Sequence, residues 1–312
     1  MGPQSGGVDV SVLNKMKKAW RNIEWLVRGG GLRQRVAEIE LRMAETQEAM
    51  RNANHCLRVL VRHAERNCEV QGHRMSLDEK DSLGLLWNGC YEPFETELVG
   101  CHIKKGDVVL DIGANIGYYT LLFARQVGET GRVFAFEPDP VNFALLKRNV
   151  QRNGYENVEL IQKAVAARTE SMHLYLNDEN RGDHRVYDSH DGRPSISIEA
   201  VSLDDYFKDF DGRINFIKMD IQGSEEGALR GMAGLLRRHA TVKLLTEFWP
   251  VGLHRYGAEA AEFLRMIEQQ DFEIHHVNEG AKRLEPVDVH ELTRVYTPEK
   301  ENYTNLFCTR AA

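Results

Sequence analysis

The 312-residue chain has few cysteines and prolines and no long apolar run. Its cysteines form no C-x-x-C pair, which excludes a cysteine zinc site and a disulfide framework and favours the reducing cytoplasm. No apolar stretch approaches the about 18 residues of a membrane-spanning helix, and no N-terminal apolar segment has the form of a secretory signal. We therefore expect a cytoplasmic protein. The five cysteines are Cys56, Cys68, Cys90, Cys101 and Cys308.

Several nucleotide-binding and metal-binding motifs are also absent. No G-x-x-x-x-G-K-[ST] occurs, which excludes a P-loop, and the twelve histidines form no H-E-x-x-H. The glycine loop Gly113-Ala-Asn115-Ile-Gly117 has Asn where a dinucleotide fingerprint needs its second Gly. Because a pyrophosphate requires that close approach of the backbone, NAD and FAD are disfavoured as ligands.

Acidic residues outnumber basic ones, and the excess lies in the larger part of the chain. Residues 1–70 hold 12 Lys and Arg against 8 Asp and Glu, a net charge of +4, whereas residues 71–312 hold 28 against 39, a net charge of −11. A protein that binds long nucleic acids normally carries a basic surface over its binding region. The charge distribution therefore disfavours RNA and other nucleic acids as substrates or partners.

A strand-turn-helix-strand pattern is the most informative feature that is present. Residues 108–112 form an apolar run, which predicts a buried strand of a parallel sheet. Gly113 and Gly117 bracket a tight turn into a predicted helix, where small residues let backbone N–H groups approach a ligand. A second predicted strand, 132–136, ends at Glu137, which is placed to accept hydrogen bonds from two ribose hydroxyls. The pattern predicts a nucleoside site, and a nucleoside without phosphates, S-adenosylmethionine, fits the loop best.

Five segments along the chain form a specific combination. Residues 106–120, Gly-Asp-Val-Val-Leu-Asp-Ile-Gly-Ala-Asn-Ile-Gly-Tyr-Tyr-Thr, precede Phe136-Glu137-Pro138 and Ile214-Asn-Phe-Ile-Lys-Met-Asp220-Ile-Gln-Gly223-Ser-Glu225. Glu247-Phe-Trp-Pro and Asn305-Leu-Phe-Cys follow. Together, over roughly residues 85–310, they resemble the FkbM-family methyltransferases. The resemblance implies a class I, Rossmann-like α/β fold with a seven-stranded, mostly parallel sheet, S-adenosylmethionine as methyl donor, and usually a hydroxyl of a sugar or natural product as acceptor.

The nucleoside pattern and the resemblance together assign a set of cofactor-binding residues. Tyr91 lies in the segment that, in FkbM-like proteins, sits beside the methionine half of the cofactor. In the same family the adenine is commonly bordered by residues at the end of the third strand, here predicted over 158–165. The residues expected to bind the cofactor are Tyr91, Asp111, Gly113, Ala114, Asn115, Gly117, Glu137, Pro138, Lys163, Ala164 and Val165.

Two further predicted strands, 214–219 and 242–246, end at Asp220 and Glu247. Strand ends border the ligand crevice in open α/β sheets, so we expect both acids near the reacting methyl group as catalytic residues. A hydroxyl acceptor needs a base or a metal to assist loss of its proton. Asp220 is the first candidate for the base and neutral His184 is its rival. Alternatively, Asp220 and Glu247 bind Mg²⁺.

A polar connection of residues 177–194 joins two predicted strands. It is long for a hairpin loop, so we expect it to lie over the mouth of the site and select the acceptor. The alternative is a surface loop without a ligand. The side chains suited to contact sugar hydroxyls or a phosphate are Asn180, Arg181, His184 and Arg185.

Gln222 departs from the family pattern, in which this position is usually Glu. Gln can hydrogen-bond a sugar hydroxyl, so it is a candidate substrate-binding residue. Alternatively, the position is structural and caps the helix that begins at 224–226. If the missing acid were the base or a metal ligand, the activity would be impaired.

Residues 1–75 form a predicted helical extension ahead of a catalytic domain over residues 76–312. From 31 to 67 a heptad repeat places Val36, Met43, Met50, Leu57 and Ala64 in one series and Leu32, Ile39, Thr46, Ala53 and Leu60 in the other. One interpretation is a coiled coil that makes the protein a homo-oligomer. The other is a long helix or helical hairpin packed on its own catalytic domain.

Residues 10–28 form a separate predicted helix. Apolar residues recur on one face at spacings of three and four, among several Lys and Arg residues and two Trp. A basic amphipathic helix with tryptophan can lie on an anionic membrane surface, here the inner one. The alternative is that the helix docks on a neighbouring subunit.

The sequence as a whole predicts an S-adenosylmethionine-dependent O-methyltransferase acting on a sugar or glycan hydroxyl. A macrolide or other natural-product hydroxyl is the nearest variant. Methylation at nitrogen or on RNA is a rival from another chemical class. A non-catalytic oligomerising scaffold with a methyltransferase fold is the rival without turnover.

Overall fold

The computed structural model describes residues 10–28, 37–50, 53 and 67–310. Internal contacts divide the chain into two units, residues 1–61 and residues 62–312. Each unit is described by itself.

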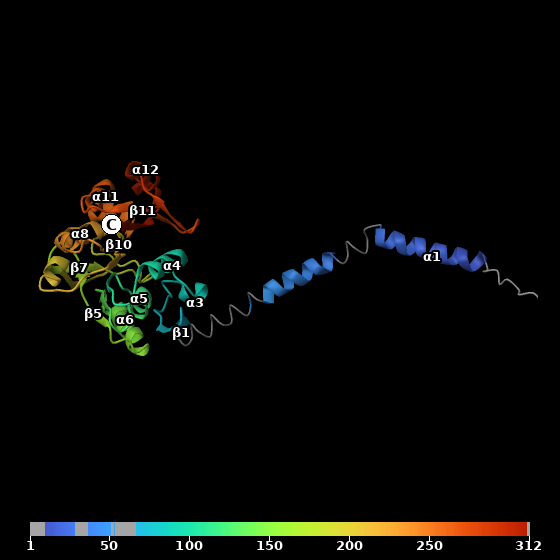
Figure 1. The fold of residues 1–312 in the computed structure, drawn as a ribbon, viewed down its shortest axis with the longest axis horizontal. Helices are drawn as coiled ribbons and strands as arrows, with labels where there is room; N and C mark the ends of the chain where they lie inside the picture. The colour runs from blue at the N-terminus through green and yellow to red at the C-terminus, as the bar shows by residue number, and fades with distance from the viewer. Residues whose placement is uncertain (1–9, 29–36, 51–52, 54–66, 311–312) are drawn as a thin grey trace, which may run out of the picture. The chain divides into compact units, whose positions relative to one another are not determined.

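The first unit contains two helical segments, α1 (Val10–Arg28) and residues 37–50 (Figure 1). All side chains described in them, residues 14–23 and 37–50, are exposed. Of the predicted heptad positions, Ile39, Met43, Thr46 and Met50 lie in the second helix, Ala53 is helical, and the others lie outside the described residues. None of the described helices is long and apolar enough to cross a membrane. An oligomer through these helices and a membrane contact through residues 10–28 stay predictions.

The second unit begins with a hairpin of β1 (Asn67–Val70) and β2 (His73–Ser76). The side chain of Asn149 on α6 (Pro140–Arg152) binds both backbone groups of Ser76, at 2.6 Å from the amide nitrogen and 3.0 Å from the carbonyl oxygen. The structure therefore divides the chain earlier than the predicted boundary at residues 75 and 76, because this hairpin packs on α6 of the second unit.

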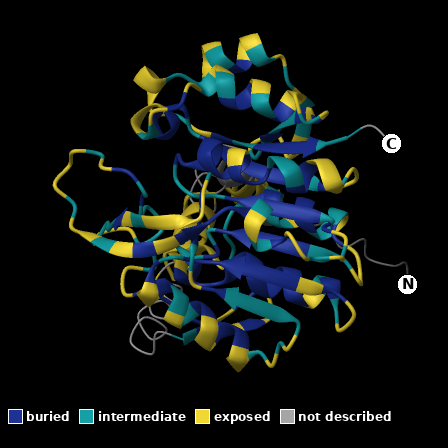
Figure 2. Cartoon of the chain, turned by 90° about the vertical axis from the view of Figure 1, so that its left-hand side faces the viewer, coloured by how far each residue is buried: buried dark blue, intermediate teal, exposed yellow. Residues whose placement is uncertain are grey.

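A mixed eight-stranded sheet forms the centre of this unit, and Figure 2 shows its middle strands buried. Five strands are parallel, because apolar runs such as Val-Val-Leu-Asp-Ile are covered on both faces. The predicted class I fold is confirmed, with eight strands in place of seven. The order is β12 (Arg283–Pro286), β11 (Glu273–Asn278), β13 (Thr304–Thr309), β10 (Lys243–Phe248), β9 (Phe216–Met219), β3 (Val108–Ile112), β4 (Arg132–Phe136) and β5 (Val158–Ile161).

A second sheet departs from the sequence prediction. The strand predicted over 158–165 is two strands in different sheets, since the amide of Lys163 turns back to bond the carbonyl oxygen of Ile161 at 3.0 Å. The three-stranded sheet has the order β6 (Ala164–Val165), β8 (Ser195–Val201) and β7 (Glu170–Tyr175). The polar connection of residues 177–194 therefore leaves β7 and returns to β8.

Helices connect the strands of the sheet. Asp139 caps α6 by accepting a hydrogen bond from the Asn142 amide, and Pro140 takes the first helical turn. The other helices are α3 (Leu85–Asn88), α4 (Pro93–His102), α5 (Tyr118–Val127), α7 (Leu203–Tyr206), α8 (Glu225–Gly231), α9 (Ala233–Arg238), α10 (Pro250–Tyr256), α11 (Ala260–Glu268), α12 (Val289–Val295) and the 3₁₀ turn η1 (Pro298–Lys300).

Deleting residues 1–66 tests the predicted role of the extension. We expect the truncated protein to keep the far-UV circular dichroism of an α/β domain but to have a lower oligomeric state by light scattering. The truncation must stop before Asn67, because the hairpin packs on α6. If the full chain and the truncated protein have the same oligomeric state, the coiled-coil interpretation is wrong.

Candidate functional site

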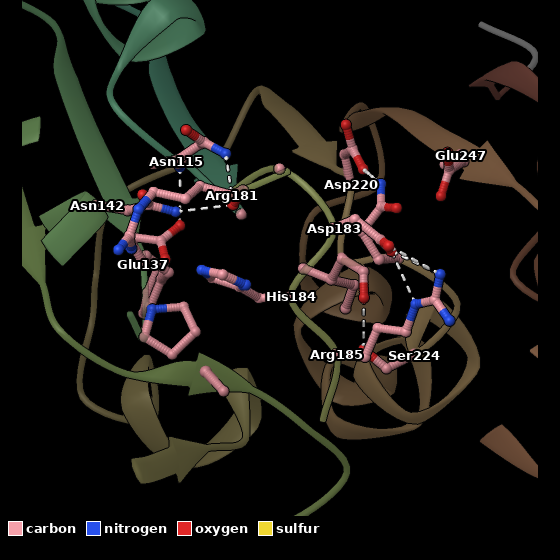
Figure 3. A pocket seen from close by; sticks show the side chains of 18 of the residues that line it. Asn115, Glu137, Asn142, Arg181, Asp183, His184, Arg185, Asp220, Ser224 and Glu247 are labelled. Carbon is pink, nitrogen blue, oxygen red and sulfur yellow. Dashed lines mark hydrogen bonds and ion pairs between the residues drawn. The ribbon is translucent and has the colours of Figure 1, made fainter. Parts of the chain in front are cut away.

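A cavity of about 420 Å³ opens where β3, β4, β9 and β10 end. This volume suits a small-molecule ligand. The cavity has two ends, shown in Figure 3. We call the end with Glu137 and Asn142 the nucleoside end, after the ligand predicted for it, and the end with Asp220 and Glu247 the carboxylate end. The cavity lining also includes Tyr91, Ala114, Pro138, Lys163, Ala164, Val165, Lys218 and Trp249. All predicted site residues line this cavity except Gly117.

The turn after β3 is held by two glycines with different tasks. Gly113 has a φ of +81°, and a Cβ there would lie 2.0 Å from the carbonyl oxygen of Asp220. Gly117 has a φ of +95° and would meet the Leu146 side chain at 2.8 Å. The prediction that Gly117 touches the cofactor therefore has no support: this residue positions α5 against α6, outside the cavity lining. Asn115 also adopts a positive φ, and its side chain caps the Ile116 amide at 2.7 Å.

Glu137, at the tip of β4, accepts two backbone hydrogen bonds. The Asn115 amide donates to one carboxylate oxygen at 2.8 Å, and the Asp139 amide donates to the other at 2.9 Å. Burial raises the pKa of Glu137 to about 8, although the hydrogen bond from the Asp139 amide opposes the shift. Each oxygen keeps one further hydrogen-bonding position, as an acceptor or, on the protonated oxygen, as a donor. The carboxyl group is therefore fixed in place and can hydrogen-bond two hydroxyls of a ligand.

The connection of residues 177–194 reaches back over the nucleoside end. The carbonyl oxygen of Arg181 accepts hydrogen bonds from the side chains of Asn142, at 3.0 Å, and Asn115, at 3.4 Å. The Arg181 guanidinium pairs with Asp139 at 3.3 Å. Arg181 was predicted to bind the acceptor, but the structure places it beside the nucleoside set.

Arg185 and Asn180 are also engaged within this connection. The Arg185 guanidinium makes two hydrogen bonds to Asp183, at 2.8 and 3.0 Å, and one to Ser189 at 2.9 Å. It lies 4.9 Å from the ring of Trp249, at the carboxylate end. The Asn180 side chain accepts from the Gly182 amide at 2.9 Å. Both line the cavity, and Arg185 shapes the wall with its donors already in use.

His184 is buried, and its two ring nitrogens differ. Nδ1 accepts a hydrogen bond from the Asn177 amide at 2.9 Å, so the proton of the neutral ring lies on Nε2. Nε2 is buried without a hydrogen-bond partner. Burial lowers the pKa of His184, which keeps the ring neutral. A base needs a free lone pair facing the acceptor, so this geometry does not suit the predicted role of rival base.

At the carboxylate end, Asp220 is held by two donors. Gln222 donates to Oδ1 at 2.9 Å, and the ammonium of Lys218 lies 3.5 Å from Oδ2. Gln222, the residue that departs from the family pattern, therefore hydrogen-bonds the Asp220 carboxylate and does not cap the helix. The turn is held by Glu225, whose Oε1 accepts from the amides of Ile221, at 3.0 Å, and Gly223, at 3.2 Å.

Glu247 differs from Asp220 because its Oε2 is buried and has no hydrogen-bond partner. Burial, reinforced by the charges of Asp220, Glu225 and Glu92, raises the pKa of Glu247 well above its usual value. The side chain lines the cavity at the end of β10. It is therefore a carboxyl group with high proton affinity and a free acceptor site.

Lys218 is the buried cation of this end. Burial opposes its charge, but Asp220, Glu95, Glu92 and Asp111 outweigh burial and raise its pKa. Its ammonium also lies 4.5 Å from the ring centre of Tyr119. Burial raises the pKa of Asp111 to about 6, against the opposing charge of Lys218.

The Mg²⁺ alternative gains no support from the geometry. Among the described residues, no three or more His, Cys, Asp or Glu side chains are grouped in a way that could hold a metal ion. Beside Asp220 the compensating positive charge is the Lys218 ammonium.

Lys218, Asn142 and Trp249 are among the lining residues that were not predicted as site residues. Lys218 interrupts the apolar strand Phe-Ile-Lys-Met two residues before Asp220, and a lone lysine in a buried strand was the available signal. Trp249 lies in the motif Glu247-Phe-Trp-Pro, which was the available signal, whereas Asn142 carried none, because only the fold brings it to the cavity.

Comparison with known proteins adds independent information. A family model described as the Methyltransferase FkbM domain matches residues 111–278, more than half of the chain. The chain therefore belongs to the FkbM methyltransferase family, whose members depend on S-adenosylmethionine. The resemblance stated from the motifs is confirmed.

Individual relatives match over limited lengths. FkbM of Streptomyces tacrolimicus, a 31-O-demethyl-FK506 methyltransferase, is 48% identical over 54 residues, which is 17% of this chain and 20% of that protein. Methyltransferase 1 of Beauveria bassiana is 24% identical over 144 residues, 40% of this chain and 57% of that protein. The chain thus spans less than two thirds of the length of each. The solved FkbM methyltransferase of Methylobacillus flagellatus KT has a TM-score of 0.40 and 17% identity, covering 84% of this chain and 60% of that one.

The raised pKa of Glu137 predicts a pH-dependent stability. Because the folded protein holds this proton up to a pH of about 8 while the unfolded chain loses it near 4.5, stability falls as the pH rises between these values. One such group contributes a slope of about 1.4 kcal/mol per pH unit. Glu137→Gln should remove its share of the slope, measured by urea unfolding at pH 6, 7 and 8. Glu129→Gln, at an exposed position, is the control. An unchanged slope in Glu137→Gln would contradict the prediction.

Proposed function

We propose that the protein transfers a methyl group from S-adenosylmethionine to a hydroxyl group of a sugar or glycan. The observation that supports this most is the single cavity that joins a nucleoside set around Glu137 to two strand-end carboxyl groups, Asp220 and Glu247. A hydroxyl of a macrolide or other natural product is the nearest alternative, and the name of the relative that methylates 31-O-demethyl-FK506 fits it.

The nucleoside end fits the cofactor in shape and in polarity. Gly113 keeps the backbone open where a side chain would collide with Asp220. Glu137 offers hydrogen-bonding positions for ribose hydroxyls, and Pro138 and Ala164 offer apolar surface for a base. When bound, S-adenosylmethionine supplies a methyl group that its sulfonium has already activated for transfer. The protein then has to hold the acceptor hydroxyl in line and accept its proton.

Glu247 is the better candidate for that proton. Asp220 already accepts from Gln222 and faces the Lys218 ammonium, and both contacts stabilise its ionised form. Glu247 lines the cavity, its buried Oε2 has no hydrogen-bond partner, and its pKa is raised. We therefore rank Glu247 first as the base. Asp220 has the electrostatic role of raising the proton affinity of Glu247.

The charges of the cavity favour an acceptor without phosphate or carboxylate groups. Each positively charged side chain among the described lining residues is paired with an acid: Lys163 with Glu199, Arg181 with Asp139, Arg185 with Asp183 and Lys218 with Asp220. An anionic acceptor would have to break one of these pairs or be buried without a partner. This supports a neutral polyol over RNA, as does the acidic charge of residues 71–312.

Calorimetric titration with S-adenosylhomocysteine and then NAD tests the cofactor class. We expect micromolar binding of the first and none of the second. Glu137→Ala should weaken binding by about 1–3 kcal/mol, because two hydrogen bonds of about 0.5–1.5 kcal/mol each are lost. Unchanged affinity would refute the ribose assignment, and no binding to the intact protein would favour the scaffold rival.

Replacing Glu247 tests the proton transfer. Glu247→Gln should lower the rate of S-adenosylhomocysteine formation on an accepted glycoside by about 100-fold or more, while the affinity for S-adenosylhomocysteine stays within about twofold. Asp220→Asn is the comparison variant at the neighbouring strand end. A larger rate loss in Asp220→Asn than in Glu247→Gln would restore Asp220 as the base.

A further inference from the structure

We call residues 177–184 the first limb of the polar connection. This limb is hydrogen-bonded to the nucleoside end of the cavity. The backbone amide of Arg181 donates to the hydroxyl of Ser82 at 2.9 Å. The backbone carbonyl oxygen of Arg181 accepts from the side chains of Asn142 and Asn115. Asn142 lies on the first turn of α6, directly after Glu137 and Pro138. Arg181 of this limb therefore lies beside Glu137 and Asn142, where the proposed cofactor has its nucleoside, and Figure 3 shows Asp220 and Glu247 on the other side of the cavity.

His184 is one of the residues of this limb that line the cavity. In Figure 3 its ring points toward Glu137 and Asn142. Its side chain is 7% exposed, and its Nε2 carries a proton with no acceptor in the protein. A buried donor without a partner is costly, by about 1–3 kcal/mol, and such groups are rare in native structures unless a ligand or water completes them.

We propose that His184 is a cofactor-binding residue whose Nε2–H donates a hydrogen bond to the nucleoside of S-adenosylmethionine. The limb from Asn177 to His184 then clamps the cofactor and does not select the acceptor. This inference rests on the proposed function, since it assigns a contact within the same cavity.

An internal partner for Nε2 is the competing explanation. The nearest acid oxygen is Oδ2 of Asp139, at 3.8 Å, which is beyond hydrogen-bond distance. That oxygen already accepts from the Asn142 amide at 2.8 Å and from the Arg181 guanidinium at 3.3 Å. If His184 served only this internal contact, its replacement would lower stability and leave cofactor affinity unchanged.

Two substitutions of His184 distinguish the hydrogen bond of Nδ1 from that of Nε2. In His184→Asn the amide oxygen can take the place of Nδ1 and keep the contact with the Asn177 amide, but no donor reaches the position of Nε2. In His184→Gln the longer side chain can bring an amide N–H to that position. His190→Ala is the control on the same connection, because the His190 side chain is 88% exposed.

Calorimetric titration of these full-length variants with S-adenosylhomocysteine and with adenosine alone tests the proposal. We expect His184→Asn to bind both ligands about tenfold more weakly, and His184→Gln and His190→Ala to stay within about threefold of the unmodified protein. Thermal unfolding of each variant reports any loss of folding separately.

The remaining outcomes are decisive in the other direction. Equal affinity in all variants, or an equal loss in His184→Asn and His184→Gln, would overturn the assignment of the Nε2 donor. A loss seen with S-adenosylhomocysteine but not with adenosine would move the contact off the nucleoside and overturn it too. Failure of the unmodified protein to bind S-adenosylhomocysteine would instead refute the proposed function, and the inference with it.

Discussion

The carboxylate end of the cavity depends on the positive charge of the buried Lys218 ammonium. Ionised carboxylates cannot be buried together without a compensating charge, because the cost of removing each from water exceeds what the fold can supply. Lys218 provides this compensation from the middle of an otherwise apolar strand. The acids whose charges act on it include Asp220, Glu95, Glu92 and Asp111. Because its ammonium is closest to Asp220, Glu247 is left with an unpartnered oxygen and a raised pKa.

The two ends of the cavity are linked by direct backbone packing. The turn at Gly113 lies against the carbonyl of Asp220 so closely that no side chain fits between them. The same turn is tied to Glu137 through the Asn115 amide. A shift of β9 against β3 would therefore move the nucleoside loop and the carboxylates together, which keeps a bound donor and the proton acceptor at a fixed separation.

The sequence predicted the features that depend on local pattern. Apolar runs ending in an acid located β3, β4, β9 and β10, and the family motifs placed residues at the end of each of these strands in the cavity lining. It did not predict β12, because Arg-Leu-Glu-Pro has no apolar alternation and pairs only through its hairpin with β11. It also placed Arg181 and His184 with the acceptor. Their actual neighbours, Asn142 and Asp139, are about forty residues away in the chain, and no local pattern encodes that contact.

The contacts that hold residues 177–185 at both ends of the cavity have a consequence for the order of events in the proposed reaction. One limb, at Arg181, bonds Asn115 and Asn142 at the nucleoside end, while the other, at Arg185, packs on Trp249 at the carboxylate end. A single loop thus borders both substrates of the proposed reaction. In the proposed reaction, a nucleoside beneath the first limb would be covered by the same loop that borders the acceptor. The expected kinetics are ordered, with the methyl donor binding first and its demethylated product leaving last.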